Sequence, residues 1–169
     1  EDLFPGTRRQ RQLSDAYPEV VIRTVLFDLD GTLADTAPDL AHALNAVRLS
    51  HDLPALPYEV IRPVVSHGGK ALIELGFGES APHVDFEALR RQLLQIYRTN
   101  LATHTVLFPG MAGLLESLEA RGHNWGVVTN KPGWLTEPLL QALGLSERAA
   151  CIVSGDTLSQ RKPDPAPLL

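Results

Sequence analysis

The chain has 169 residues, of which 44% are hydrophobic and 21% charged, and its formal net charge is −5. These values fit one globular domain, with or without a small insertion, and they exclude a long repeat array or a chain that is disordered throughout. The acidic balance argues against nucleic acid or an anionic membrane as a partner, because both favour a basic surface. The single cysteine cannot form an internal disulfide and no apolar run is long enough to span a membrane, so we expect a cytoplasmic protein.

The beginning of the chain predicts an extension followed by a strand. We expect residues 1–19 to be flexible, because the arginines of this segment are not followed by the apolar stretch of a signal peptide. The next segment, Val20 to Leu29, is apolar and rich in β-branched residues, and it is too short for a typical helix. It predicts a buried strand that ends at the turn-forming pair Asp30-Gly31.

The segment that follows, residues 36–103, is predicted to be helical. Thr36, Pro38 and Asp39 are typical of the start of a helix. The spacing of apolar residues predicts a longer amphipathic helix that begins near Asp85. Two shorter helices are expected between them, one over Pro57 to Gly69 with an interruption at Pro63 and one over Lys70 to Leu75.

After residue 110 the pattern becomes one of alternating helices and strands, which predicts a parallel α/β sheet with right-handed crossovers. Pro138 is expected near the start of a regular helical segment. Cys151 lies in an apolar strand and is expected to be a buried, unreactive thiol. The four expected elements are a helix that ends at Gly122, a strand over Trp125 to Thr129, a helix closed by Gly144 and a strand over Ala150 to Ser154.

Asp28 and Asp30 carry the clearest chemical signal. They lie two residues apart at the carboxyl end of the first predicted strand, so both side chains are expected on the same side. Two adjacent carboxylates repel each other near neutral pH unless a cation bridges them or one takes up a proton. The carboxyl end of a strand in an open parallel sheet is also a common ligand site. The alternative is that Asp30-Gly31 only forms a tight turn.

Two further polar pairs follow the other predicted strands. Thr129-Asn130 ends the second strand, and Lys162-Pro163 lies beyond the third. A hydroxyl and an ammonium that converge on the carboxylate pair would form a phosphate-binding site. Taken singly, a Thr-Asn pair is common in turns and a lone lysine is usually a solvated surface charge.

Taken in order, these segments resemble the haloacid dehalogenase-like (HAD) phosphatases. Residues 28–36 resemble the first motif of that family, D-x-D-G-T-L-x-D-[ST], and the pairs at 129–130 and 162–163 resemble the second and third. The sequences LFPG, WGVVTNKP and KPDPAPL are most similar to the phosphoglycolate phosphatase branch, which includes N-acetylmuramic acid 6-phosphate phosphatases. The resemblance implies a Rossmann-like HAD core at residues 20–35 and 104–169, with a helical cap inserted at 36–103.

The resemblance also implies Mg²⁺-dependent hydrolysis of a small phosphate monoester through an aspartyl-phosphate intermediate. Asp28 would be the nucleophile, Asp30 would be the general acid and base, and Lys162 would neutralise the phosphoryl group. Asp28 and the main-chain carbonyl of Asp30 would bind the metal. The residues implied to bind phosphate or substrate are Gly31, Thr129 and Asn130, together with Lys70, for which a simple helix-breaking turn at Ser66 to Lys70 is an equal alternative.

The sequence departs from the family at its fourth motif, a Gly-Asp followed by another Asp, which supplies further carboxylates for Mg²⁺. That motif is expected well beyond Lys162, whereas the chain ends at Leu169. We therefore expect the first strand to become an exposed edge. We also expect residues 1–169 alone to bind Mg²⁺ weakly, to be poorly soluble and to show no Mg²⁺-stimulated phosphate release. Two other functions stay open, a phosphosugar mutase of the same fold and a catalytically inactive binding domain.

Overall fold

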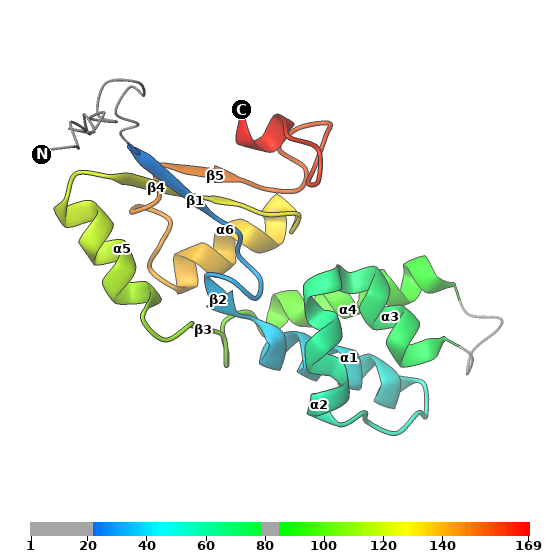
Figure 1. Ribbon diagram of the computed structural model, residues 1–169. Coiled ribbons are helices and arrows are strands. Elements are labelled where there is room, and N and C mark those ends of the chain that lie inside the picture. Colours follow the sequence, from blue (N-terminus) through cyan, green and yellow to red (C-terminus); the bar gives the residue numbers. More distant parts are fainter. Residues whose placement is uncertain (1–21, 79–84) are drawn as a thin grey trace, which may run out of the picture.

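The computed structural model describes residues 22–78 and 85–169, and it contains a parallel sheet with helices against it (Figure 1). The strands lie in the order β1 (Thr24–Phe27), β4 (Asn124–Val128) and β5 (Cys151–Val153), and both pairings are parallel. Two helices, α5 (Met111–Ala120) and α6 (Gly133–Ala142), connect these strands. The predicted α/β fold with a parallel sheet is thus confirmed. The predicted extension at residues 1–19 and the beginning of the predicted first strand lie outside the described residues.

One face of the sheet is buried against α5 and α6. Phe27, Trp125 and Val127 share a hydrophobic cluster with Leu115 of α5 and Leu139 of α6. Trp125 and Val127 lie two residues apart, so their side chains leave β4 on the same face. Burial of this face holds the three strands in register, because a shift by one residue would move the apolar set to the other face.

The opposite face of the sheet is largely exposed, and this corrects two expectations. Leu26 is 38% exposed and Cys151 is also exposed. The first strand is therefore not buried as its apolar sequence predicted, and only Phe27 among its four residues is buried. Because β1 pairs with β4 alone, the expectation of an exposed edge strand is confirmed within the described sheet. The expectation of a buried thiol at Cys151 is wrong for the same reason, because β5 forms the other edge of the described sheet.

Pro138 also differs from the expectation, since it lies inside α6 rather than near its start. A proline in this position removes one hydrogen bond, the one that its backbone N–H would donate to the carbonyl of Trp134. Trp134 is 44% exposed and lies in the first turn, where water can reach the carbonyl. The helix therefore continues through Pro138 to Ala142.

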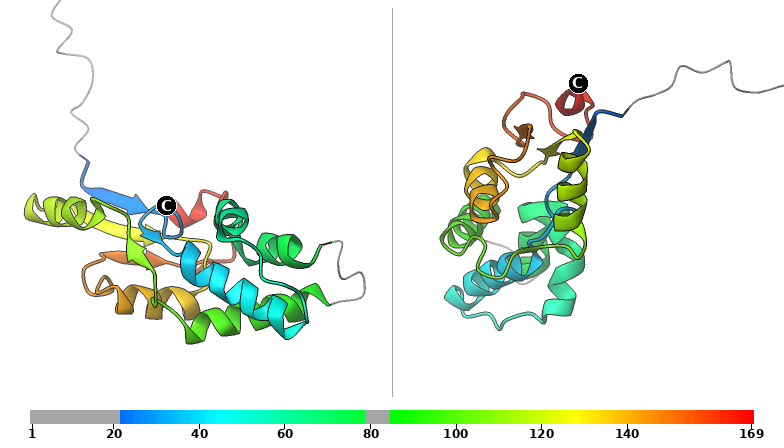
Figure 2. Two further views of the ribbon diagram at one scale, coloured as in Figure 1. Left: turned by 90° about the horizontal axis from the view of Figure 1, so that it is seen from below. Right: turned by 90° about the vertical axis from the view of Figure 1, so that its left-hand side faces the viewer.

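The helices between β2 and β3 form a second body, here called the helical part, with a hydrophobic core to which α6 adds Leu135. They lie together beyond one end of the strands (Figures 1 and 2). Their arrangement agrees with the prediction of helices in this segment, and none has the length and apolar composition that a membrane span requires within the described ranges. They are α1 (Ala37–Ser50), α2 (Tyr58–Ile61), the 3-10 helix η1 (Arg62–His67), α3 (Gly68–Phe77) and α4 (Phe86–Thr99).

The two helix starts singled out in the sequence behave differently. The helix α4 begins near Asp85 as expected, and Asp85 caps it, because its Oδ1 accepts hydrogen bonds from the backbone N–H of Glu87 (2.9 Å) and of Ala88 (3.1 Å). Thr36 occupies the N-cap position of α1, but its side chain makes no capping hydrogen bond. Its hydroxyl donates instead to Asp30, so this residue belongs to the site described below.

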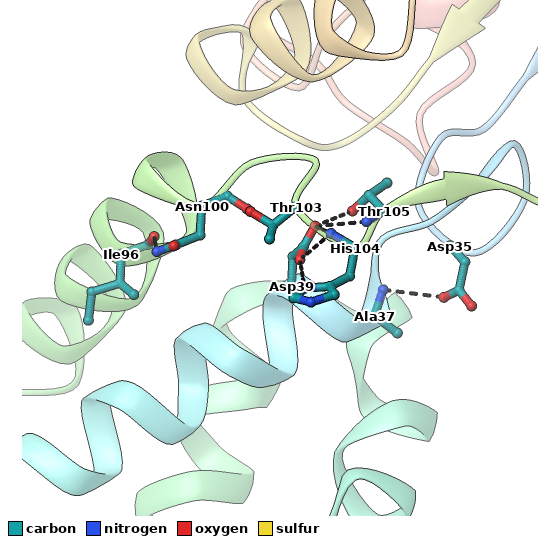
Figure 3. A network of polar contacts seen from close by, with 8 residues as sticks. All are labelled: Asp35, Ala37, Asp39, Ile96, Asn100, Thr103, His104 and Thr105. Atoms are coloured by element: carbon teal, nitrogen blue, oxygen red, sulfur yellow. Dashed lines mark hydrogen bonds and ion pairs between the residues drawn. The ribbon is translucent and has the colours of Figure 1, made fainter.

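The two connections between sheet and helical part are tied to each other. A short antiparallel pair that the sequence did not predict joins β2 (Ala34–Asp35) to β3 (Val106–Leu107). Beside it, the carboxylate of Asp39 on α1 is 1% exposed and faces His104 and Thr105 (Figure 3). It accepts hydrogen bonds from the backbone N–H of His104 (2.9 Å), the backbone N–H of Thr105 (3.0 Å) and the Thr105 hydroxyl (2.7 Å).

Candidate functional site

A cavity of about 770 Å³ lies where the carboxyl ends of β1 and β4 meet the helical part. Its walls combine side chains from both parts, so substrate in it would contact both. The end of the chain adds Arg161, Lys162 and Pro163 to the lining. The other charged or polar lining residues used below are Asp28, Asp30, Lys70, Glu87, Arg90, Tyr97, Thr129, Asn130 and Lys131.

Asp28 follows β1 directly and presents one carboxylate oxygen to the cavity. Its Oδ1 accepts the backbone N–H of Leu29 at 2.8 Å and forms an ion pair with Nζ of Lys162, also at 2.8 Å. The same ammonium donates to the carbonyl of Val128 at 2.7 Å, which anchors Lys162 to the end of β4. Oδ2 of Asp28 accepts no hydrogen bond from the described residues, and the side chain is 45% exposed.

Asp30 is held in the same way by different donors. Its Oδ1 accepts from the Thr36 hydroxyl at 2.6 Å and from Nζ of Lys131 at 2.8 Å. The Asp30 side chain is 20% exposed and that of Lys131 only 7%. Neither donor was predicted from the sequence, although Lys131 follows Thr129 at the end of a predicted strand, the kind of position that singled out Asp28 and Asp30.

Lys131 is a buried cation. Burial by itself would lower the pKa of its ammonium, but the neighbouring Asp30 carboxylate and Tyr97 outweigh burial and raise that pKa above its usual value. The ammonium also lies over the ring of Tyr97, 4.6 Å from the ring centroid. Burial likewise raises the pKa of the Tyr97 phenol, whose oxygen has no hydrogen-bond partner among the described residues. Lys131 is therefore charged and Tyr97 neutral near neutral pH.

The second and third sequence pairs meet beside the carboxylates. Thr129 is 4% exposed and its hydroxyl oxygen accepts the backbone N–H of Lys131 at 3.1 Å, which leaves the hydroxyl proton for another acceptor. The side-chain amide of Asn130 donates to the carbonyl of Lys162 at 2.9 Å, so it joins the two pairs. The structure thus brings together Asp28, Asp30, Thr129, Asn130 and Lys162.

Gly31 lies opposite Ser66 of the helical part and is not among the residues that line the cavity. Its φ of +77° favours glycine, and an added Cβ would lie 2.9 Å from the Ser66 hydroxyl. Its backbone N–H donates to the carbonyl of Ala34 at 3.0 Å, so this amide already has an acceptor within the loop.

Lys70 lines the cavity from the first turn of α3, well exposed to solvent. Its side chain is 81% exposed, and its ammonium lies 3.7 Å from the carboxylate of Glu74. Arg90 of α4 lines the same wall, with 39% of its side chain exposed and a 3.2 Å ion pair to Glu87. Arg90 was missed in the sequence because one arginine on an amphipathic helix carries no local signal. The helical wall therefore carries two cations, each paired with a glutamate, and Glu87 lines the cavity beside them.

The oxygen atoms at the end of β1 fit Mg²⁺ better than a softer metal. Within the described ranges no three or more His, Cys, Asp or Glu side chains gather as a metal site. The Asp28 carboxylate and the main-chain carbonyl of Asp30 offer oxygen alone. Mg²⁺ is commonly bound by one or two carboxylates, with waters and substrate phosphate as its other ligands, and this donor set fits that pattern.

Comparison with known proteins gives consistent results. The family model of the haloacid dehalogenase-like hydrolases matches residues 25–169. The chain is 45% identical over 148 residues to an N-acetylmuramic acid 6-phosphate phosphatase of Pseudomonas putida, covering 88% of this chain and 66% of that one. It is 44% identical to a phosphoglycolate phosphatase of Xanthomonas campestris, covering 87% and 66%. A crystal structure of a predicted phosphoglycolate phosphatase from Haemophilus somnus superposes with a TM-score of 0.77 at 30% identity, covering 87% and 68%. The chain thus spans 66% of the length of these two curated relatives.

Proposed function

The chain belongs to the haloacid dehalogenase-like hydrolases, and on this premise we propose that the protein hydrolyses phosphate monoesters of small metabolites with Mg²⁺ as its cofactor. The observation that carries the proposal is the pair Asp28 and Asp30 at the end of β1. Each carboxylate has its Oδ1 held by a lysine and a second donor, and each lines the cavity. Thr129 and Lys162 stand beside them as groups that can hold a phosphoryl group.

The reaction follows from the roles of the two carboxylates. Oδ2 of Asp28 attacks phosphorus, the bond from phosphorus to the ester oxygen breaks, and the leaving alkoxide takes a proton from Asp30. The product of this step is an acyl phosphate on Asp28. Asp30 then removes a proton from water, the water oxygen attacks phosphorus, and inorganic phosphate leaves Asp28 as a carboxylate again. Lys162 and the Thr129 hydroxyl hold the phosphoryl oxygens throughout.

The charges of the site support the need for a cation. With both carboxylates ionised, Lys131 and Lys162 balance Asp30 and Asp28, and the proton that Asp30 holds before the first step leaves these four side chains with one net positive charge. A phosphate monoester brings about two negative charges near neutral pH, which these lysines cannot also balance. Mg²⁺ at the Asp28 carboxylate and the Asp30 carbonyl would supply the missing positive charge and stabilise the transferring phosphoryl group.

The substrate we propose is a small phosphorylated carboxylic acid. Both curated relatives are named for such substrates, phosphoglycolate and N-acetylmuramic acid 6-phosphate. Lys70 and Arg90 on the helical wall are suited to a carboxylate, because cations pair with anions and the arginine fork can bind one with two hydrogen bonds.

The test is phosphate release by the intact protein. Wild type is expected to release inorganic phosphate from phosphoglycolate, N-acetylmuramic acid 6-phosphate or both, and from p-nitrophenyl phosphate. Asp28→Asn is expected to abolish release from all of them, because the attacking oxygen is lost at almost unchanged shape. Asp52→Asn is the matched control, since Asp52 is exposed and outside the cavity lining. Phosphate release by Asp28→Asn at the wild-type rate would refute the role of Asp28 as the nucleophile. Transfer of the phosphoryl group to a substrate molecule instead of to water would indicate a mutase.

A further inference from the structure

We propose that Lys131 is a positioning residue for Asp30, and that the ring of Tyr97 holds Lys131 in place from the helical part. The proposal rests on the proposed function, in which Asp30 donates the proton to the leaving group. It adds a residue from the end of β4 and one from α4 to the groups that control this proton.

The geometry around Asp30 decides which oxygen can carry the proton. Lys131 and Thr36 both bond to Oδ1, at 2.8 Å and 2.6 Å. An ammonium has donors and no acceptor, so Oδ1 cannot carry a proton toward Lys131. The acidic proton of Asp30 is therefore placed on Oδ2. With Lys131 removed, either carboxyl oxygen could be protonated and the group could rotate away from the leaving group.

Tyr97 explains why the Lys131 ammonium stays in this place. The Lys131 side chain is only 7% exposed, and its ammonium lies 4.6 Å from the centroid of the Tyr97 ring. A cation over an aromatic face is attracted by the ring, and more strongly where water is excluded. The Tyr97 hydroxyl has no hydrogen-bond partner among the described residues, and the ring supplies the contact with the ammonium.

Tyr97 also connects two parts of the molecule at this point. It lies fully buried on α4 in the core of the helical part, whereas Lys131 follows β4 of the sheet. Tyr97 on α4 is thus connected to Asp30, the proposed acid, through two contacts. The Tyr97 ring contacts the Lys131 ammonium, and that ammonium pairs with the Asp30 carboxylate. A change in the core around Tyr97 is expected to alter proton transfer without touching Asp28.

The leaving group separates a positioning role from a purely structural one. p-Nitrophenolate leaves without a proton, whereas an alkoxide such as that of phosphoglycolate requires one. The value of kcat/KM reports the steps up to transfer of the phosphoryl group to Asp28. Lys131→Met is expected to lower kcat/KM for phosphoglycolate by about 100-fold, within the range of general acid catalysis, and to lower it far less for p-nitrophenyl phosphate. Equal losses on the two esters would overturn the proposal.

Further variants test each contact. Lys131→Arg keeps a cation and is expected to restore part of the kcat/KM for phosphoglycolate that Lys131→Met loses. Tyr97→Leu removes the ring and is expected to shift the ratio of the two kcat/KM values toward that of Lys131→Met, whereas Tyr97→Phe keeps the ring and the ratio. An unchanged ratio in Tyr97→Leu would refute the role of Tyr97. If Lys131→Met does not fold, Thr36→Val tests the proposal in its place. This variant removes the other donor to Oδ1 of Asp30 and is expected to lower kcat/KM selectively for phosphoglycolate.

Two control variants distinguish failure of this proposal from failure of the proposed function. Asp30→Asn is expected to show the same selective loss on phosphoglycolate, and Asp28→Asn to lose both esters. If both behave so while Lys131→Met and Thr36→Val lose both esters equally, the positioning role is refuted and the phosphatase stands. If Asp30→Asn affects the two esters equally, Asp30 is not the acid and the proposed function fails at that step.

Discussion

Replacing Asp39 by alanine is expected to destabilise the intact protein by about 3–5 kcal/mol, because it leaves buried donors without an acceptor. The backbone N–H and the hydroxyl of Thr105 both bond to this carboxylate, and Thr105 is 4% exposed. A buried donor that loses its partner costs about 1–3 kcal/mol. The backbone N–H of His104 adds a third bond at 2.9 Å, while its ring is 66% exposed and adds little.

The assay is the free energy of unfolding from urea titration, followed by circular dichroism. Asp85→Ala is the matched control, because Asp85 also accepts two backbone N–H groups but is exposed, and loss of such a cap costs about 1 kcal/mol. An Asp39→Ala variant no less stable than Asp85→Ala would refute the reasoning, since burial would then add nothing to the cost of the lost bonds.

Three further predictions concern substrate, metal and pH. Lys70→Ala is expected to raise KM for phosphoglycolate more than for p-nitrophenyl phosphate, whereas equal increases would remove Lys70 from carboxylate binding. Chelation of divalent cations is expected to stop phosphate release and added Mg²⁺ to restore it, and release that persists in excess EDTA would contradict the metal assignment. Hydrogen bonds from Arg148 and Trp125 lower the pKa of Glu119 in the folded protein. The ionised Glu119 therefore contributes fully to stability above the pKa that it has in the unfolded chain, and this contribution is lost as the pH falls through its pKa in the folded protein. The difference in Tm between neutral and acidic pH should therefore be smaller for Glu119→Gln than for wild type. An equal difference in the two proteins would contradict a role of the ionised Glu119 in stability.

The sequence predicted those parts of the fold and the site that depend on local order. The alternation of helices and strands predicted the parallel sheet, and polar residues at strand ends then predicted that Asp28, Thr129 and Lys162 lie together. The carboxyl ends of parallel strands meet at one edge, so such residues converge however the rest of the chain packs. Lys131 was missed as a partner of Asp30, although it follows Thr129 by two residues, because the sequence does not show which side chains of the loop after a strand turn toward the carboxylates. Burial of β1 was overestimated, because apolar composition does not report how many neighbours a strand has.

Thr36 and Asp39 show why local rules fail at the junction of the two parts. Their spacing is typical of a helix cap, in which each would bond a backbone N–H of the same turn. In the structure Thr36 donates to Asp30, and Asp39 accepts from Thr105, 66 residues away. Both alternatives involve buried groups, for which an unmade hydrogen bond costs more than a cap lost at a helix start that water can reach. Thr36 and Asp39 therefore bond to groups where the sheet meets the helical part. The helix α1 begins with Pro38 in its first turn, and the backbone N–H of Ala37 donates to the carboxylate of Asp35 instead of to Thr36.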